Sequence, residues 1–257
     1  MTTISLSVPP GTVETVYLRP QSVAEILSAS LSLLRRHFWR FAGVYLAATV
    51  PAHLMIIYGQ TTGQPAIGVV GLLLLLLVVT AVQPLLTIMI GDICRGMEPS
   101  LRRAASLTLR RLPVVIVNSV IVLVIIVLGF MLFVVPGIIA FVQLMFVAPI
   151  STLEEKRWGM AALRRSRQLG SGLHWRNFRA FGLAFLLAFG LALLALPIVM
   201  LLQRTEIPGL DVLFQNVVNG ITQIVGLIIS VLLYYELRAR KEGLTPDVLM
   251  QDLSAGS

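Results

Sequence analysis

The distribution of basic residues constrains the fold of this chain more than any other feature. Six apolar stretches are visible, at residues 38–58, 66–90, 114–135, 138–153, 180–202 and 217–235. If each stretch crosses a membrane, nineteen of the twenty Lys and Arg residues lie on one side and Arg204 lies on the other. Cytoplasmic loops of membrane proteins carry an excess of Lys and Arg. The pattern therefore predicts an all-α, polytopic membrane protein with six transmembrane helices and both termini in the cytoplasm.

Composition supports this class of protein. Hydrophobic residues make up 57% of the 257 residues, charged residues make up 12%, and the mean hydropathy is +0.90. A soluble domain carries much more polar surface than this. A transmembrane helix needs about 20 predominantly apolar residues, and five of the six stretches reach that length.

The fourth stretch, at residues 138–153, is short and raises the question of whether 114–153 is one kinked helix or a hairpin. Pro136 and Gly137 can form a turn, because proline lacks a backbone donor and glycine adopts positive φ easily. A single crossing would also separate the basic residues before 114 from those after 153. A hairpin keeps them on one side, as the positive-inside bias favours. We therefore predict three hairpins of two spans each.

The chain is expected to form one membrane domain with two tails. Residues 1–18, with several Pro and Gly residues and no signal peptide pattern, predict a mobile N-terminal tail. Residues 19–242 form the six-helix membrane domain, and residues 243–257 form a cytoplasmic C-terminal tail. The predicted localisation is the bacterial cytoplasmic membrane.

A threefold internal repeat is visible in the basic segments. Each copy combines small or apolar residues with arginines and precedes an apolar stretch, and the third copy is the weakest. The copies are Ala29-Ser30-Leu31-Ser32-Leu33 with Arg35-Arg36, Ala105-Ser106-Leu107-Thr108-Leu109 with Arg110-Arg111, and Arg164-Arg165-Ser166-Arg167-Gln168-Leu169. The third is followed by His174-Trp175-Arg176-Asn177-Phe178, which is similar to His37-Phe38-Trp39-Arg40-Phe41. The predicted unit is a basic amphipathic helix followed by a hairpin.

Local signals support these basic helices. Ser22 and Glu25 have the spacing of a capping box, in which each side chain bonds to the backbone N–H of the other residue. Pro99 suits a first helical position. Gly170 and Gly172 are expected to end the third basic helix. Helices of this kind lie in the headgroup layer, bury their apolar face and present arginine to phosphate.

The arginines of these segments are the candidate binding residues for anionic headgroups or a protein partner. They share a position just before a predicted hairpin. They are Arg35, Arg36, Arg102, Arg103, Arg110, Arg111, Arg164, Arg165 and Arg167.

An acidic residue ends each even-numbered span on the basic side. These residues are Asp92, Glu154 (next to Glu155) and Glu236. Salt bridges to neighbouring arginines are the favoured interpretation, because charges at membrane edges usually anchor helices. The alternative is a ring of carboxylates around a pseudo-threefold axis that guards a pore or a cation site.

Neutral polar residues occur inside or near the spans, and four amides are candidates for lining a cavity: Gln83, Asn118, Gln143 and Gln223. Amides in membrane helices more often bond to neighbouring helices. Charged residues in mid-membrane, which mark ion pathways, are missing from these spans. We therefore favour a structural role for the amides, and we expect His53 to be a packing or interfacial histidine.

Small residues recur every four positions at Ala180, Ala184, Ala188 and Ala192. This spacing allows helices to approach closely. It predicts either packing within the six-helix bundle or a contact between copies of the chain.

The sequence contains no motif of a known catalytic or metal site. Walker, HExxH, CxxC and GxSxG patterns are missing, and the three histidines do not have metal-ligand spacing. We expect no catalytic residues, no cofactor and no metal. The net charge of +8 is explained by topology and by anionic lipids, so no nucleic acid is expected as a partner.

Several motifs together resemble a bacterial integral-membrane family, the one named after the membrane domain of glycerophosphoryl diester phosphodiesterase. The likeness covers about residues 19–250. It rests on Arg19-Pro20 before Ser22-Val23-Ala24-Glu25-Ile26-Leu27, on Val134-Val135-Pro136-Gly137-Ile138, on Ala161-Ala162-Leu163-Arg164-Arg165-Ser166, and on Tyr234-Tyr235-Glu236-Leu237-Arg238. The resemblance implies a six-helix protein of the bacterial cytoplasmic membrane. The phosphodiesterase of that family is a separate soluble domain, so the resemblance implies no catalytic residues here.

The leading functional hypothesis is a non-enzymatic membrane protein that binds lipids, chiefly anionic headgroups, or protein subunits of a membrane complex. The alternative is a transporter or channel for a small solute, lipid or ion, because three hairpins can enclose a cavity. A third hypothesis, an interfacial enzyme, would need Asp92, Glu154 or Glu236 to converge with His37 or His174.

Overall fold

The computed structural model describes residues 21–154, 157–205 and 207–243. Within these ranges 87% of residues are helical and there is no strand, which confirms the predicted all-α class. The eight helices are α1 (Val23–Thr61), α2 (Pro65–Cys94), α3 (Leu101–Leu132), α4 (Val134–Leu144), α5 (Val147–Leu153), α6 (Met160–Gly170), α7 (His174–Leu202) and α8 (Leu210–Glu242). The predicted tail at 1–18, all but Gly243 of the predicted tail at 243–257, the Arg19-Pro20 motif and Glu155 lie outside the described residues.

Six helical segments are long and apolar enough to cross a membrane. They are α1, α2, α3, the 20-residue segment Val134–Leu153 that contains α4 and α5, α7 and α8. Each predicted apolar stretch falls on one of these segments, apart from the last three residues of 114–135. The chain is therefore a multi-pass membrane protein.

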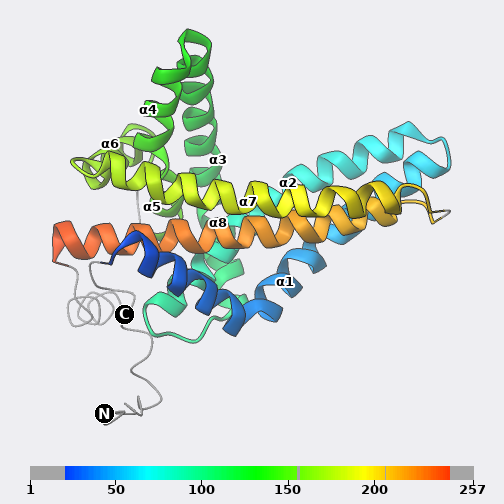
Figure 1. Ribbon diagram of the computed structural model, residues 1–257, viewed down its shortest axis with the longest axis horizontal. Helices are drawn as coiled ribbons and strands as arrows, with labels where there is room; N and C mark the ends of the chain where they lie inside the picture. Colours follow the sequence, from blue (N-terminus) through cyan, green and yellow to red (C-terminus); the bar gives the residue numbers. More distant parts are fainter. Residues whose placement is uncertain (1–20, 155–156, 206, 244–257) are drawn as a thin grey trace.

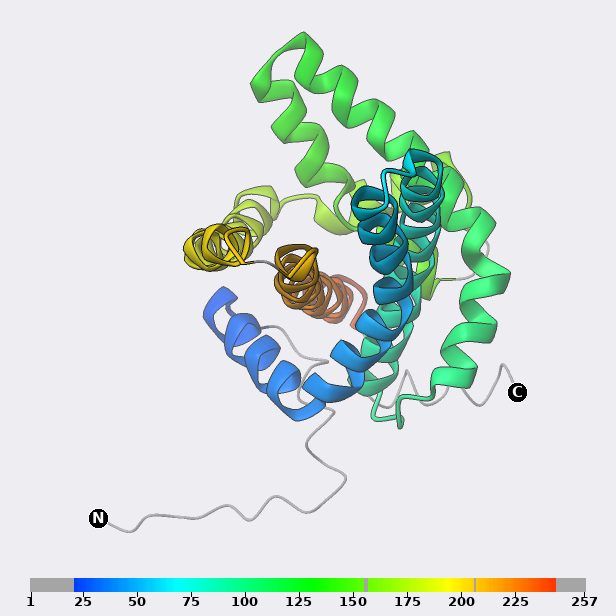
Figure 2. The same ribbon diagram turned by 90° about the vertical axis from the view of Figure 1, so that its right-hand side faces the viewer.

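The first two basic segments are continuous with the spans that follow them. A single helix of 39 residues, α1, contains both Arg36 and the first apolar stretch, and α3 does the same over 32 residues. Both helices change direction along their length (Figure 2). The capping box at the start of α1 is confirmed, because the Ser22 hydroxyl accepts from the Glu25 N–H and the Glu25 carboxylate accepts from the Ser22 N–H. Pro99 precedes the N-cap of α3, which is Ser100, so its predicted place at the first helical position is wrong.

The third basic segment is a separate helix. As predicted, α6 ends at Gly170, and Gly172 has a φ of +75° before α7 starts at His174. Glycine adopts this left-handed conformation without the steric cost that a Cβ would add. A joint thus separates α6 from the span in α7.

The turn between α3 and α4 lies at Phe133, three residues before the predicted position. Phe133 is extended (φ −166°, ψ 159°), and Pro136 and Gly137 lie in the first turn of α4. Proline fits there because first-turn N–H groups have no partner within the helix. A Cβ on Gly137 would lie 2.4 Å from the Phe130 ring, so this glycine allows the two helices to cross closely.

The fourth span is interrupted at Met145 and Phe146, between α4 and α5. Pro149 explains the break. A proline cannot donate to the carbonyl four residues earlier, here that of Met145, and its ring clashes with that carbonyl. The segment therefore continues as a second short helix in place of one straight span.

Helix α8 lies in the middle of the bundle, next to α1, α2 and α7 (Figure 2). The α3–α4 pair projects away from the direction shared by α7 and α8 (Figure 1). Buried residues concentrate where the acidic residues lie, on the second half of α2, on α5, and on 224–237 of α8. We call this region the charged end of the molecule. The regions near the Thr62–Gln64, Phe133 and 203–209 connections are called the loop ends.

Candidate functional site

Three acidic side chains lie at the charged end, and two of them are buried while the third is partly buried. Asp92 and Glu236 are 1% exposed, and Glu154 is 12% exposed. A buried charge needs an ionic or hydrogen-bonding partner, because removal from water is costly. The partners of these carboxylates therefore decide between the two predicted interpretations.

Each of the three carboxylates binds arginine. Asp92 pairs with Arg103 at 3.2 Å. Glu154 pairs with Arg157 and Arg165 at 3.0 Å each. Glu236 pairs with Arg176 and Arg240 at 2.8 Å each. These contacts support the salt-bridge interpretation, since each carboxylate is paired with at least one arginine of the protein itself.

Three consecutive residues of α8 join the Glu154 and Glu236 ion pairs to Arg95. The Tyr234 hydroxyl donates to Glu154 at 3.0 Å, and the Tyr235 hydroxyl accepts from Nε of Arg95 at 2.8 Å. Glu236 accepts from Arg176 at 2.8 Å. Successive helix residues point about 100° apart, so this tripeptide reaches α5, the end of α2 and α7 at once. We call Tyr234, Tyr235 and Glu236 the α8 hub.

Arg165 joins α6 to the same network. It binds Glu154 and also Glu242, which in turn accepts from Nε of Arg238 at 2.9 Å. Burial lowers the pKa of the Arg165 guanidinium, but the hydrogen bonds to Glu154 and Glu242 and the negative charges of these two residues together outweigh burial, so the pKa lies above its ordinary value. Arg165 therefore stays charged and holds α6 against α8.

The nine candidate arginines separate into two groups. Three of them are engaged by the protein: Arg103 by Asp92, Arg165 by two glutamates, and Arg111 by the Thr152 carbonyl. The other six are exposed, and within the described ranges they make no ion pair or side-chain hydrogen bond. They are Arg35, Arg36, Arg102, Arg110, Arg164 and Arg167.

The apolar residues of the basic segments pack against the protein. Ile26 and Leu33 of α1, Ala104 of α3, and Leu163 and Leu169 of α6 all belong to the buried core. These segments use much of their apolar face to hold the bundle together. Their exposed arginines remain available at the surface.

Asn118 is buried, and its amide is saturated by hydrogen bonds. Nδ2 donates to the Ser151 hydroxyl at 2.7 Å and to the Arg157 carbonyl at 2.9 Å. Oδ1 accepts from the Gly159 N–H at 2.7 Å. The side chain therefore joins α3 to α5 and to the start of α6, which is the structural role favoured for the amides.

The other three candidate amides are not saturated in this way. Gln83 is exposed, Gln223 is half-buried, and Gln143 is half-buried at the edge of a cavity. His53 bonds through Nδ1 to the Thr49 carbonyl at 2.9 Å, as expected for a packing histidine. The structure brings Gln143, and not the four amides as a group, to this cavity.

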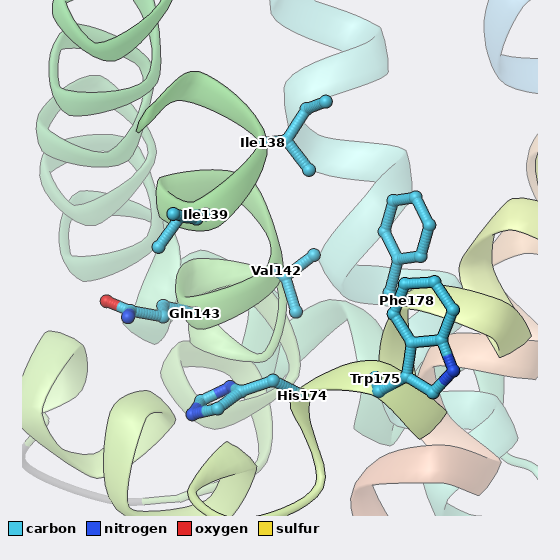
Figure 3. A pocket seen from close by; sticks show the side chains of 7 residues that line it. All are labelled: Ile138, Ile139, Val142, Gln143, His174, Trp175 and Phe178. Carbon is cyan, nitrogen blue, oxygen red and sulfur yellow. The ribbon is translucent and has the colours of Figure 1, made fainter. Parts of the chain in front are cut away.

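The cavity beside Gln143 has a volume of about 270 Å³ and lies between α4 and α7 (Figure 3). Its lining residues are Ile138, Ile139, Val142 and Gln143 of α4, and His174, Trp175 and Phe178 of α7. Figure 3 shows Gln143 and His174 toward one end, and Ile138 and Phe178 toward the other. We call this cavity the α4–α7 groove. It has an apolar part and a polar part.

Part of the alanine repeat of α7 packs inside the bundle. Ala180 is buried, and Ala184 packs against the core. Ala192 is exposed. The first half of the repeat therefore fits packing within one chain.

The described residues contain no group of three or more His, Cys, Asp or Glu side chains that could hold a metal ion. The expectation of a chain without catalytic residues or cofactors stays a prediction.

Comparisons with protein families, with curated proteins and with solved structures find no match to this chain. The resemblance to the family of the phosphodiesterase membrane domain therefore stays a prediction.

Sequence reasoning missed the α8 hub tyrosines and the α4–α7 groove as sites. The Tyr234-Tyr235-Glu236 run was noted as a motif, but its partners are as distant as Arg95, 140 residues away along the chain. For the groove, the signal was the aromatic run after Gly172. Its counterpart in the first repeat, Phe38 and Trp39, lines a second cavity of about 220 Å³ against α8.

Proposed function

We propose that this chain is a non-enzymatic subunit of a membrane assembly that binds anionic lipid headgroups or a protein partner through its exposed arginines. The observation that supports the proposal is the division among the nine candidate arginines. Three are used in internal contacts, whereas six present guanidinium groups to the surroundings without an ionic partner in the described parts of the chain. A juxtamembrane Arg near an anionic surface contributes about 1 kcal/mol of attraction.

The proposed arrangement is three hairpins, each preceded by a basic amphipathic helix, in the bacterial cytoplasmic membrane. Both termini and the charged end face the cytoplasm, as the positive-inside bias favours. The proposal includes membership of the family related to the phosphodiesterase membrane domain. Its supporting motifs include Ala161–Ser166, which in this structure is part of α6, and the α8 hub.

Orientation is tested by cysteine labelling in intact cells. Cys94 is first replaced by Ser, and single cysteines are then placed at Gly63, Gln203 and Gln168. A membrane-impermeant maleimide should label the first two and not the third. Labelling of position 168 alone would show that the orientation is the reverse of the one proposed. Labelling of all three positions would contradict the proposed arrangement.

The binding role is tested with the full chain. The six exposed arginines are changed together to Gln, and a matched variant changes the same six to Lys. After mild detergent extraction, co-purified lipids and proteins are quantified. The Gln variant should lose most of its bound phosphatidylglycerol, cardiolipin or stoichiometric partner, and the Lys variant should retain it. Equal yields from both variants and the unchanged protein would contradict the proposal.

The transporter hypothesis receives less support from the amides. Asn118 is saturated by hydrogen bonds, and Gln83 is exposed. Gln143 at the α4–α7 groove is the one candidate amide found at a described cavity. Flux of an entrapped solute through reconstituted vesicles that stops in Gln143→Leu, and not in Gln83→Leu, would favour transport over binding.

A further inference from the structure

One side of α8 is polar along much of its membrane span. Successive helix residues point about 100° apart, so six positions between 215 and 230 share a sector about 100° wide. No other residue of this stretch falls in that sector, and all six are amides, hydroxyls or glycine. They are Gln215, Asn219, Thr222, Gln223, Gly226 and Ser230. We call these six residues the polar face of α8.

The polar face of α8 is open to the surroundings. Asn219 is exposed, the other five residues are half-buried, and a Cβ on Gly226 would meet no atom within 4 Å. Gln215 donates to Asn219 of the same helix at 3.1 Å. The two hydroxyls of this face and the Gln223 amide make no hydrogen bond to any residue that the structure describes. Hydrocarbon offers no hydrogen-bond partner, so polar groups at this depth call for water or another protein.

The helices next to α8 do not supply the matching polar groups. Helix α7 has no polar side chain between Arg179 and Gln203. In α2, the Thr80 hydroxyl is used within its own helix, and Gln83 is exposed and bonds to no described residue. Helix α1 packs on a different side of α8, around Gly220. A water path is favoured by polar groups on facing helices, so the partners of this face are expected from outside the chain.

The spacing on the polar face favours a helix as its occupant. The polar positions recur after three or four residues, as they do in the seam between two helices packed side by side. They extend over about 22 Å, at 1.5 Å per residue, out of a hydrocarbon core about 30 Å thick. A small ligand would instead be recognised by polar groups gathered at one depth.

We propose that the polar face of α8 binds the same face of a second copy of this chain, so that two α8 helices cross inside the membrane. Amides and hydroxyls both donate and accept hydrogen bonds, so this face can satisfy an identical face across a two-fold axis. None of its six residues is charged, so two copies do not repel each other there. Gly226 has no side chain and lets the two backbones approach closely.

The inference deepens the proposed role in a membrane assembly, because it names a second copy of this chain as one of the subunits. It uses none of the six exposed arginines. The dimer can therefore fail while the arginines still bind headgroups or a partner, and the arginine variants can fail while the dimer persists.

Disulfide crosslinking of the full chain in native membranes tests the contact. Cys94 is first replaced by Ser, and single cysteines then replace Asn219, Thr222, Gly226 or, as the control, Val217. Val217 is 38% exposed at a similar depth but points to another side of α8. Oxidation should convert the first three variants to a product of twice 28.1 kDa and leave the control monomeric. Equal product from all four variants, or none from the first three, would overturn the proposal.

Two further measurements separate a second copy from other occupants. Gly226→Leu places a side chain at the crossing and should weaken the dimer in mild detergent at least about tenfold, as measured by light scattering at falling protein concentration. Gly182→Leu, on α7 and also with open space around it, should leave the dimer unchanged. Equal effects of these two variants would contradict the proposed crossing.

Mass spectrometry of the crosslinked product identifies what the cysteines meet. Peptides of this chain alone should be found on both sides of the disulfide, and a different protein there would contradict the proposal. A water-soluble thiol reagent should label the three polar-face cysteines poorly in membranes. Strong labelling without any crosslinked product would show that water covers this face, and would also contradict it.

Discussion

The charged end and the loop ends of this bundle are held together by different forces. At the charged end, residues 224–237 of α8 are surrounded by other helices, and carboxylates, arginines and tyrosines are bonded in specific pairs. Toward the loop ends, leucines of α2, α3 and α7 are exposed. In the most apolar 18-residue segment of α7, only 6% of the residues are buried. Polar contacts fix which helices meet at the charged end, whereas hydrocarbon surface dominates elsewhere.

This contrast follows from the environment of each region. Lipid tails are as apolar as leucine, so exposed leucine in a membrane provides no driving force for helices to associate. Buried ion pairs are directional, and breaking one leaves a charge without a partner. The charged end therefore determines how the helices are arranged, and the loop ends are free to diverge, as α3 and α4 do from α7 and α8 (Figure 1).

The largest predicted effect comes from removing the buried Glu236 carboxylate, which pairs with two arginines at the charged end. Glu236→Ala leaves Arg176 and Arg240 without their carboxylate and should destabilise the protein by about 3–5 kcal/mol. Denaturant titration in mild detergent measures the change. The matched control is Glu98→Ala, because Glu98 is 92% exposed in its pair with Arg40 and should contribute at most about 1 kcal/mol. Similar losses for the two variants would show that burial does not set the strength of these pairs.

An intermediate effect is expected from removing one hydroxyl of the α8 hub. Tyr235→Phe leaves Nε of Arg95 without its buried acceptor, and hydrogen bonds to charged groups contribute about 1.5–3 kcal/mol. Tyr58→Phe, at an exposed tyrosine near a loop end, serves as the control and should change stability by less than about 0.5 kcal/mol. The same denaturant titration compares the two. An unchanged free energy of unfolding in Tyr235→Phe would show that this contact of the α8 hub does not stabilise the protein.

The smallest effect is expected at the exposed apolar surface. Leu194→Ala on α7 should cost less than about 0.5 kcal/mol in detergent, because this side chain is 74% exposed. Leu163→Ala on α6, at a buried leucine near the charged end, should cost about 2–5 kcal/mol. Thermal unfolding followed by circular dichroism measures both. A large loss for Leu194→Ala would reveal that a protein surface, and not lipid or detergent, covers this face of α7.

Local patterns in the sequence were sufficient to predict where the six apolar spans lie. Hydropathy located the six spans, the capping box located the start of α1, and Gly170 and Gly172 located the joint before α7. The position of the turn at Phe133 was missed because Pro136 was taken as a turn residue, although proline is also compatible with a first helical turn. The break caused by Pro149 was likewise not predicted.

Contacts between distant residues could not be predicted in the same way. The acidic residues were identified from position alone, and their pairing with arginines was the favoured interpretation. However, which arginine meets which acid depends on how the helices pack, as in the pair Arg176–Glu236 from α7 and α8. The same limit applied to Arg103, Arg111 and Arg165, which resemble the exposed arginines in sequence but form internal contacts.

The continuity of α1 and α3 has a geometric consequence. In α1 and α3 the exposed arginines stand on the same unbroken helix as the apolar stretch that follows them, so their place relative to that stretch is set by helix geometry alone. The exposed arginines of α6 are joined to α7 through the left-handed Gly172, so a few backbone dihedral angles set their place relative to the next span.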